Sequence, residues 1–527
     1  MRTSYRILCG LVPATLVVSS CFGEFENPYI PEDGTQSCYE GPPGTANVGT
    51  CRYGELELNG EGKTVSACLD QVLPEPECTL SGVDTSCDGK SGALIWQRQM
   101  DGPSLHRMND MAVFPDGSVI VTGYTWGDAV IAGQKVGAGA FVVKLTAEGE
   151  GAWAKTFGPG GAVVGTSVRV DAENNVVVGV GSKAPLDLGG GTLNVTPEVL
   201  SDLIVKLDGD TGAHLWSLLI ENHTDDYSPS PPIPLANGDI AVLGLYSGDL
   251  RWDGENALSN DSEPHLFLSI LDGDGHHQKS FDYGPGIGPD AAEVSPDGAL
   301  VFLGHTGLAL PTLGATLLES ETFFVAKLGV DGAVEWARST GRLGNKNSHY
   351  FGRSIALQPD GKVAVAIPFV DELATALAPN DFDQLDVAIL AFSGTGEFQW
   401  AKSFGGDGMD APWDIAAAED GGWVVGGTYE GTLGLGTCTN VAAAKFDGFL
   451  TKLDAQGEPL WVHTFGDDGA DDGGPDPGWP SEIVMAVQVA PSGEVVMAAK
   501  YDGSVNFGGE LQPFAAAEAT AVVKYSP

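Results

Sequence analysis

Residues 400–431 read WAKSFGGDGMDAPWDIAAAEDGGWVVGGTYEG, and residues 447–458 read DGFLTKLDAQGE. The first stretch predicts a strand containing Trp400, a loop, an apolar strand, a tight turn at residues 420–422, and a second apolar strand. The second stretch predicts a strand that ends in Lys452-Leu453 before a short turn containing glycine. The pattern therefore describes four successive β-strands.

The same pattern recurs from residue 91 to the C-terminus at intervals of roughly sixty residues. The tight turns align at Gly117, Asn174, Gly238, Gly298, Gly361, Gly421 and Gly493. The tryptophan strands align at Trp96, Trp153, Trp216, Trp336, Trp400 and Trp461, and His277 is aligned with the position of a missing seventh tryptophan. Both landmarks predict seven repeats.

Seven copies of four strands predict an all-β fold, a seven-bladed β-propeller with four-stranded blades over residues 91–527. The first copy begins with its tryptophan strand near residues 93–99, and the last copy ends on its lysine strand. We therefore expect the N-terminal strand to complete the last blade. If the first apolar strand of each copy is innermost, the tight turns share one face and the variable connections share the other, which is the expected binding surface.

The copies, with residues 400–431 as the example, resemble the bacterial propeller repeats known as SBBP repeats over residues 91–527. This resemblance implies the fold and a secreted or surface protein, but the family has no shared catalytic residues to transfer. LDGDTGAHLW at 207–216 also resembles pyrroloquinoline-quinone propeller repeats, in which a tryptophan docks neighbouring blades. Because only one copy shows this pattern well, we expect no quinone cofactor, and we interpret the repeated tryptophans as packing groups.

The N-terminus predicts export. Arg2 and Arg6 precede an apolar run over residues 7–18, which is typical of a secretory signal peptide. Residues 18–21, Val-Ser-Ser-Cys, resemble the lipobox of bacterial lipoproteins, which implies a signal peptide over 1–20 and a lipid on Cys21. Ordinary signal cleavage is the alternative. Residues 22 and 23 are Phe and Gly rather than the aspartate that often retains lipoproteins at the inner membrane, so we expect the outer membrane or the cell surface.

Residues 21–90 are predicted to form a tether and a small cysteine-bearing neck. The disulfide candidates are Cys38, Cys51, Cys68, Cys78, Cys87 and Cys438. Their density in an exported segment and the lack of a C-x-x-C pair favour disulfides over a zinc site. Five of the six lie in the neck, so the odd cysteine has Cys438 as its only partner elsewhere. The spacing leaves the pairing open.

The charge of the chain limits its partners. The sequence has 26 Lys and Arg against 71 Asp and Glu, a formal net charge of −45. Nucleic acid is therefore not expected as a partner, and membrane contact is expected only through the lipid anchor. No G-x-S-x-G, H-E-x-x-H, Walker or Rossmann motif occurs, so no catalytic residue is assigned.

The predicted variable loops contain the candidate ligand residues. These are His106, His223, Asp225, Asp226, Tyr227, His349, Tyr350, Trp413 and Trp479. The loop at 466–480 carries clustered carboxylates, Asp467, Asp468, Asp471, Asp472 and Asp476, which together with glycines could bind Ca²⁺. A solvated acidic loop is the alternative, because the closing glutamate of an EF-hand is missing.

These observations favour an exported, lipid-anchored propeller that binds a protein or polysaccharide at the bacterial cell envelope without catalysis. Two alternatives remain open at this stage. One is an exported propeller enzyme acting on glycans as a lyase or hydrolase. The other is an envelope-assembly lipoprotein.

Overall fold

The computed structural model describes residues 35–41, 45–57, 64, 66–73, 92–159, 162–195, 200–221, 231–252, 254–261, 263–307, 310–342, 352, 354–369, 385–406, 408–435, 438–466, 482–501, 503–509 and 519–527. Every regular element within these segments is a β-strand, so none of the described residues forms a helix that could span a membrane. Contacts divide the chain into a small N-terminal unit, described between residues 35 and 73, and a large unit that holds residues 92–527.

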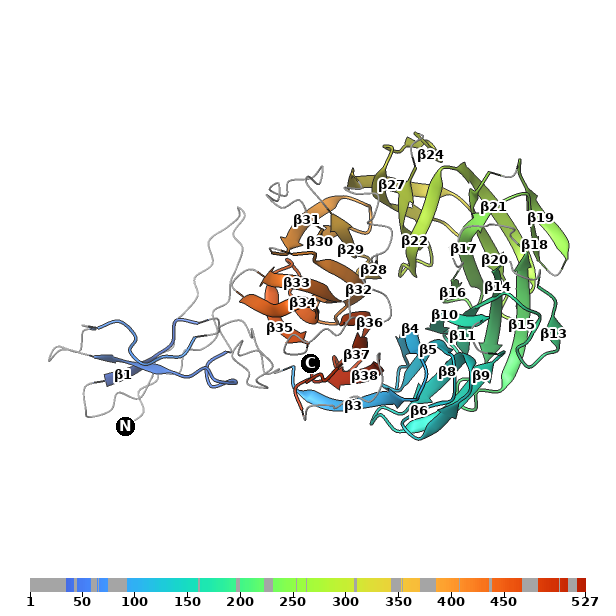
Figure 1. The fold of residues 1–527 in the computed structure, drawn as a ribbon. Helices are drawn as coiled ribbons and strands as arrows, with labels where there is room; N and C mark the ends of the chain where they lie inside the picture. Colours follow the sequence, from blue (N-terminus) through green and yellow to red (C-terminus); the bar gives the residue numbers. More distant parts are fainter. Residues whose placement is uncertain are drawn as a thin grey trace, which may run out of the picture. The chain divides into compact units, whose positions relative to one another are not determined.

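The large unit is a seven-bladed β-propeller whose blades are antiparallel sheets with four core strands (Figure 1). Blade 1 consists of β4 (His106–Val113), β5 (Val119–Thr125), β8 (Gly139–Leu145) and β9 (Gly151–Phe157). Blade 2 consists of β10 (Val163–Val170), β11 (Val176–Ser182), β14 (Ser201–Leu207) and β15 (His214–Glu221). Blade 3 consists of β16 (Pro232–Pro234), β17 (Ile240–Tyr246), β20 (His265–Leu271) and β21 (His277–Pro285).

The remaining blades repeat this order. Blade 4 consists of β22 (Ile287–Val294), β23 (Leu300–Thr306), β26 (Thr322–Leu328) and β27 (Val334–Arg342). Blade 5 consists of β28 (Ser354–Leu357), β29 (Val363–Phe369), β30 (Asp386–Phe392) and β31 (Phe398–Phe404). Blade 6 consists of β32 (Ala411–Ala417), β33 (Trp423–Leu435), β34 (Cys438–Leu453) and β35 (Pro459–Phe465). Blade 7 consists of β36 (Ile483–Val489), β37 (Val495–Tyr501), β38 (Ala519–Tyr525) and β3 (Leu94–Asp101).

The ring closes as the sequence predicts. β3, from the N-terminal side of the propeller, pairs antiparallel with β38 from Leu94↔Tyr525 to Met100↔Thr520. The first strand of every blade contacts the first strand of the next blade, and β36 of blade 7 contacts β4 of blade 1. The first strands therefore form the inner wall of the ring, and β3 is the outer strand of blade 7.

The local turns and the core follow from the repeat. The seven aligned turn residues, Gly117, Asn174, Gly238, Gly298, Gly361, Gly421 and Gly493, all have positive φ between 63° and 90°. This conformation suits glycine and asparagine and lets two residues reverse the chain. Seven separate clusters of buried apolar side chains lie at the seven junctions between blades. Each blade thus buries both of its faces against its neighbours.

The tryptophans dock neighbouring blades. The indole Nε1 donates a hydrogen bond of 2.9–3.3 Å to a carbonyl in the next blade, with the pairs Trp96–Ala147, Trp153–Gly209, Trp216–Gly273, Trp336–Gly394 and Trp400–Ala455. The accepting carbonyl always lies in the turn between the third and fourth strands. These tryptophans therefore stabilise the ring by packing and hydrogen bonding between blades.

The alignment of His277 with the missing tryptophan is wrong. In the other blades the tryptophan pairs with the penultimate residue of the third strand, but in blade 3 the corresponding pair is Ile270↔Lys279. Lys279 therefore occupies the tryptophan position, and the ring of Phe281 packs over Gly332 of the next blade. The other blades carry the same β-bulge, and in them a turn glycine of positive φ lies four residues before the tryptophan. In blade 3 this glycine is Gly275, which places Lys279 and not His277 at the tryptophan position.

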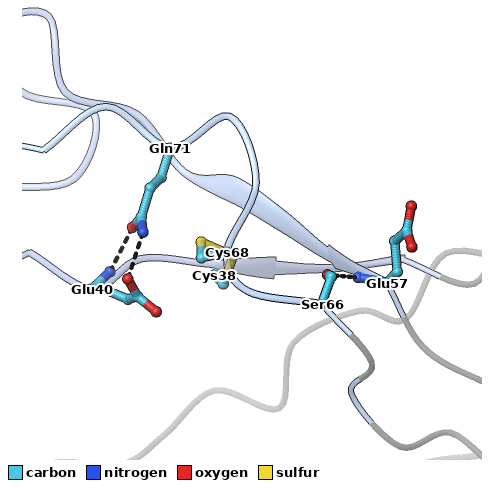
Figure 2. Close-up of a disulfide and its surroundings, with 6 residues drawn as sticks. All are labelled: Cys38, Glu40, Glu57, Ser66, Cys68 and Gln71. Atoms are coloured by element: carbon cyan, nitrogen blue, oxygen red, sulfur yellow. Dashed lines mark hydrogen bonds between the residues drawn. A yellow bond between two sulfur atoms is a disulfide. The ribbon is translucent and has the colours of Figure 1, made fainter.

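The N-terminal unit contains a short hairpin and the predicted kind of crosslink. β1 (Thr35–Cys38) pairs antiparallel with β2 (Gly54–Glu57), and a disulfide joins Cys38 to Cys68 (Figure 2). Gln71 exchanges two hydrogen bonds of 2.8 Å with Glu40, its Oε1 accepting from the backbone N–H and its Nε2 donating to the carboxylate. Because so small a unit buries little apolar surface, the disulfide supplies much of its order.

Candidate functional site

The topology separates two faces of the propeller. In blades 1 to 6 the turns between strands 1 and 2 and between strands 3 and 4 lie at one end of the sheet, which we call the tight-turn face. The connections between strands 2 and 3 and between successive blades lie at the other end, which we call the variable face. The variable face carries added hairpins: β6 (Ala129–Ile131) and β7 (Gln134–Val136) extend the sheet of blade 7, and β18 (Asp249–Trp252) and β19 (Glu255–Ser259) extend that of blade 2.

Two smaller hairpins occupy the same connections in blades 2 and 4. They are β12 (Leu186–Asp187) with β13 (Thr192–Leu193), and β24 (Thr312–Leu313) with β25 (Thr316–Leu317). The described connections of blades 1 to 4 therefore differ from one another on this face, while the tight turns remain nearly uniform. Variation in loops on a uniform scaffold is typical of a binding surface.

Charged side chains from the inner strands form a first cluster. Arg169 of β10 lies 2.6 Å from the Asp110 carboxylate of β4 and 3.8 Å from that of Glu293 in β22. Asp110 raises the pKa of Arg169, so the guanidinium stays charged. Burial raises the pKa of Asp414 to about 7, although this carboxylate accepts hydrogen bonds from Ser354 and the N–H of Val487. Because their partners come from neighbouring inner strands, these groups hold the inner wall together.

A buried pair of carboxyl groups lies at the junction of blades 5 and 6. Asp386 begins β30, Asp410 ends the connection to blade 6, and the two side chains hydrogen-bond to each other and are 1% and 0% exposed. Burial raises the pKa of Asp386 to about 7 and that of Asp410 to about 8, and the nearby carboxylate of Glu430 adds to the second shift. Two buried carboxyls in contact cannot both be ionised at low cost, so the pair retains a proton near neutral pH.

The junction of Asp386 and Asp410 is tightly built. The N–H of Gly406 donates to Asp410 Oδ2 at 2.8 Å, and a Cβ added at Gly405 would lie 2.0 Å from Asp386 Oδ1 and 3.0 Å from Asp410 Oδ2. Glycine at position 405 is therefore required for the two carboxyls to approach each other. The pair belongs to the variable face.

A third cluster joins three strands of blade 3 on the same face. Asp282 of β21 accepts hydrogen bonds from the Tyr246 hydroxyl at 2.8 Å, from the N–H of Gly284 at 2.7 Å, and from His265 Nδ1 at 3.0 Å. Burial would raise the pKa of Asp282, but these hydrogen bonds lower it, so the carboxylate is ionised. The Asp261 carboxylate lies 4.0 Å from the other ring nitrogen of His265.

Two grooves lie on the opposite, tight-turn face. One, of about 680 Å³, lies between blades 4 and 5 and is lined by Trp336, Lys327 and Thr395. The other, of about 760 Å³, lies between blades 7 and 1 and is lined by Trp96, Arg98 and Lys524. In both grooves the indole N–H of the tryptophan already donates a hydrogen bond to the next blade, so it is not free to bind a ligand.

The structure places only part of the predicted site. His106 is 1% exposed and lies 3.3 Å from Thr520 Oγ1 at the junction of blades 1 and 7. Trp413 occupies a β-bulge of β32 and is half-buried. The other ligand candidates lie outside the described residues: His223, Asp225, Asp226, Tyr227, His349, Tyr350 and Trp479. So do the acidic-loop residues Asp467, Asp468, Asp471, Asp472 and Asp476, and also Cys21, Cys78, Cys87 and the side chain of Cys438.

Arg169, Asp386 and the cluster around His265 were not predicted from the sequence, whereas Asp410 lies in one of the predicted variable loops. Within the described segments, no three His, Cys, Asp or Glu side chains are grouped so that they could hold a metal ion. Their position in the repeat could have identified two of these residues, because His265 and Asp386 each begin a third strand, next to a variable connection.

The strand order and the closed ring define a β-propeller protein. The chain is similar to a quinohemoprotein alcohol dehydrogenase from Comamonas testosteroni, with 12% identity and a TM-score of 0.40 over 82% of this chain and 76% of that one. It is also similar to the Pan2 WD40 domain of Neurospora crassa, with 9% identity and a TM-score of 0.41 over 80% and 90%. A third similar structure is BamB from Moraxella catarrhalis, with 13% identity and a TM-score of 0.33 over 80% and 97%.

No family model and no curated protein matches the chain. At these identities the likeness to solved structures concerns the fold alone, and it does not indicate what this chain binds.

Proposed function

We propose that this protein is an exported, lipid-anchored propeller that acts as a non-enzymatic binding scaffold at the bacterial cell envelope. Its ligand is a protein or polysaccharide that contacts the variable face. Lipid on Cys21 holds the chain at the membrane, and the disulfide-bearing unit follows the anchor. A Cys38–Cys68 disulfide is consistent with the oxidising compartment that this proposal requires.

The choice of the variable face as the binding surface rests on its exposed apolar side chains. Among the described residues, the three most exposed large apolar side chains are Trp126, Leu310 and Leu317, at 61%, 63% and 64% exposure. All three lie in connections between strands 2 and 3, in blades 1 and 4, and therefore on the variable face. Exposed tryptophan is enriched among the residues that anchor protein interfaces. The tryptophans of the tight-turn face, in contrast, are used to join the blades.

Site-specific photo-crosslinking on intact cells tests this proposal. A photoreactive side chain replaces Trp126 or Leu317 on the variable face, and Thr395 on the tight-turn face provides a matched exposed control. We expect one stoichiometric envelope protein or glycan to be captured from the variable positions and not from Thr395. Capture from Thr395 alone would overturn the choice of face.

The identity of the captured molecule separates the alternative functions. Recovery of an envelope-assembly protein would replace simple ligand binding with an assembly role. Turnover of a captured glycan by the purified protein would replace the scaffold with an enzyme.

The anchor is tested separately. Metabolic labelling with palmitate should mark the wild-type chain, and Cys21→Ser should remove the label and release the protein from the membrane fraction. An unlabelled wild-type chain would contradict the anchor and leave the proposed binding face to be judged by the crosslinking alone.

A further inference from the structure

The contacts of His265 with Asp282 fix the orientation and the tautomer of its imidazole. Asp282 accepts hydrogen bonds from the Tyr246 hydroxyl and the N–H of Gly284, and His265 Nδ1 lies 3.0 Å from the same carboxylate, so this nitrogen is placed to donate its proton to Asp282. In the neutral imidazole the lone pair is therefore on Nε2. The Tyr246 hydroxyl and the N–H of Gly284 hold Asp282 from two other sides, so the ring has one orientation.

The free nitrogen faces a second ligand group. Asp261 Oδ1 lies 4.0 Å from His265 Nε2, which is too far for a hydrogen bond, and its side chain is 82% exposed and free to move. A tetrahedral ion with bonds of about 2.1 Å holds two ligand atoms roughly 3.4 Å apart. Closing the gap therefore needs a movement of about half an ångström by an exposed carboxylate.

We propose that His265 Nε2 and the Asp261 carboxylate bind a divalent transition-metal ion of the zinc type on the variable face of blade 3. Imidazole with one carboxylate suits zinc better than calcium, which prefers oxygen ligands alone. The carboxylate of Asp282 behind the ring is the usual outer partner of a metal-binding histidine. The net charge of −45 draws cations to the surface.

Two protein ligands leave the rest of the coordination sphere open. Water fills these positions in the isolated protein, so the site binds more weakly than one with three protein ligands. This assignment does not depend on the proposed scaffold function.

Calorimetric titration of the metal-free, processed full chain with Zn²⁺ near neutral pH tests the site. We expect one saturable site in the wild type, and its loss in His265→Ala and in Asp261→Asn. Asp282→Asn keeps both ligands but releases the ring, so it should weaken Zn²⁺ binding by 10 to 100-fold. A purely structural role for Asp282 would leave the affinity unchanged.

His305→Ala is the matched control. His305 also contacts a carboxylate through Nδ1, at 3.0 Å from Asp290, but it lies in blade 4. This variant should bind Zn²⁺ like the wild type. If His265→Ala does not fold, Asp261→Asn decides the test, because the Asp261 side chain is exposed. Absence of Zn²⁺ binding in the wild type, or unchanged binding in Asp261→Asn, would overturn the proposal.

Discussion

Asp410→Asn should make the propeller more resistant to alkaline pH. In the folded chain Asp386 and Asp410 are buried in contact, and the pKa values are raised to about 7 and about 8. In the unfolded chain an aspartate releases its proton near pH 4. Between these limits the folded state binds more protons than the unfolded state, so the free energy of unfolding falls as pH rises.

The magnitude follows from one shared proton. Because the two groups titrate as a pair, we count a single proton retained up to about pH 8. One proton changes the free energy of unfolding by about 1.4 kcal/mol per pH unit, which is about 4 kcal/mol between pH 5 and pH 8. An amide at position 410 has no proton to lose and can donate to the Asp386 carboxylate. The variant should therefore lack this part of the pH dependence.

Urea unfolding followed by tryptophan fluorescence at several values between pH 5 and pH 8 measures the effect. Relative to the wild type, Asp410→Asn should gain stability steadily as pH rises, and Asp386→Asn should behave alike. The double variant should show no larger gain, because the pair shares one proton. Parallel pH curves for the wild type and both single variants would refute the shared-proton account.

Three further predictions also concern unfolding in urea. Trp216→Phe removes a docking hydrogen bond and should cost about 1 kcal/mol more than Trp461→Phe, because the Trp461 indole N–H has no hydrogen-bond partner; equal losses would contradict this. Burial lowers the pKa of His463 to about 3, so stability should fall by about 1.4 kcal/mol per unit as pH drops below about 6.5, and His463→Phe should abolish that loss. Cys68→Ser opens a loop with a sequence separation of 30 and should destabilise the N-terminal unit by roughly 3 kcal/mol while the propeller unfolds as before. Every tryptophan lies at or beyond residue 96, so limited proteolysis in urea follows the N-terminal unit and fluorescence follows the propeller.

Most of the fold could be predicted from sequence because its determinants are local and repeated. A turn with positive φ, an alternating strand and a docking tryptophan can each be recognised from a few neighbouring residues. Seven copies of the pattern make the assignment robust to departures in any single copy. Closure by β3 followed from the phase of the first and last copies. The error at His277 arose in the one copy that lacks the tryptophan, where the spacing of four residues from the turn glycine Gly275 gives Lys279 instead.

The clusters on the variable face could not be predicted in the same way. Tyr246 and Asp282 are 36 residues apart and meet only because β17 and β21 flank β20 in one sheet. The burial of Asp386 and Asp410 is equally invisible in sequence, because an aspartate beside glycine is more often a solvated turn residue. In both cases the signal depends on strand order and burial rather than on spacing.

His265 and Asp386 occupy the same position of the repeat, and other blades show that the fold does not require an ionisable side chain there. Each begins a third strand and pairs with the last residue of the second strand, Tyr246 or Phe369. Blades 1, 2 and 7 have Gly139, Ser201 and Ala519 there, so the four-stranded sheet forms without a charged or aromatic group. Ionisable side chains at this position are therefore additions to individual blades. They lie on the variable face, where the connections between strands also differ, so the chemistry of this face is set by individual blades and not by the repeat.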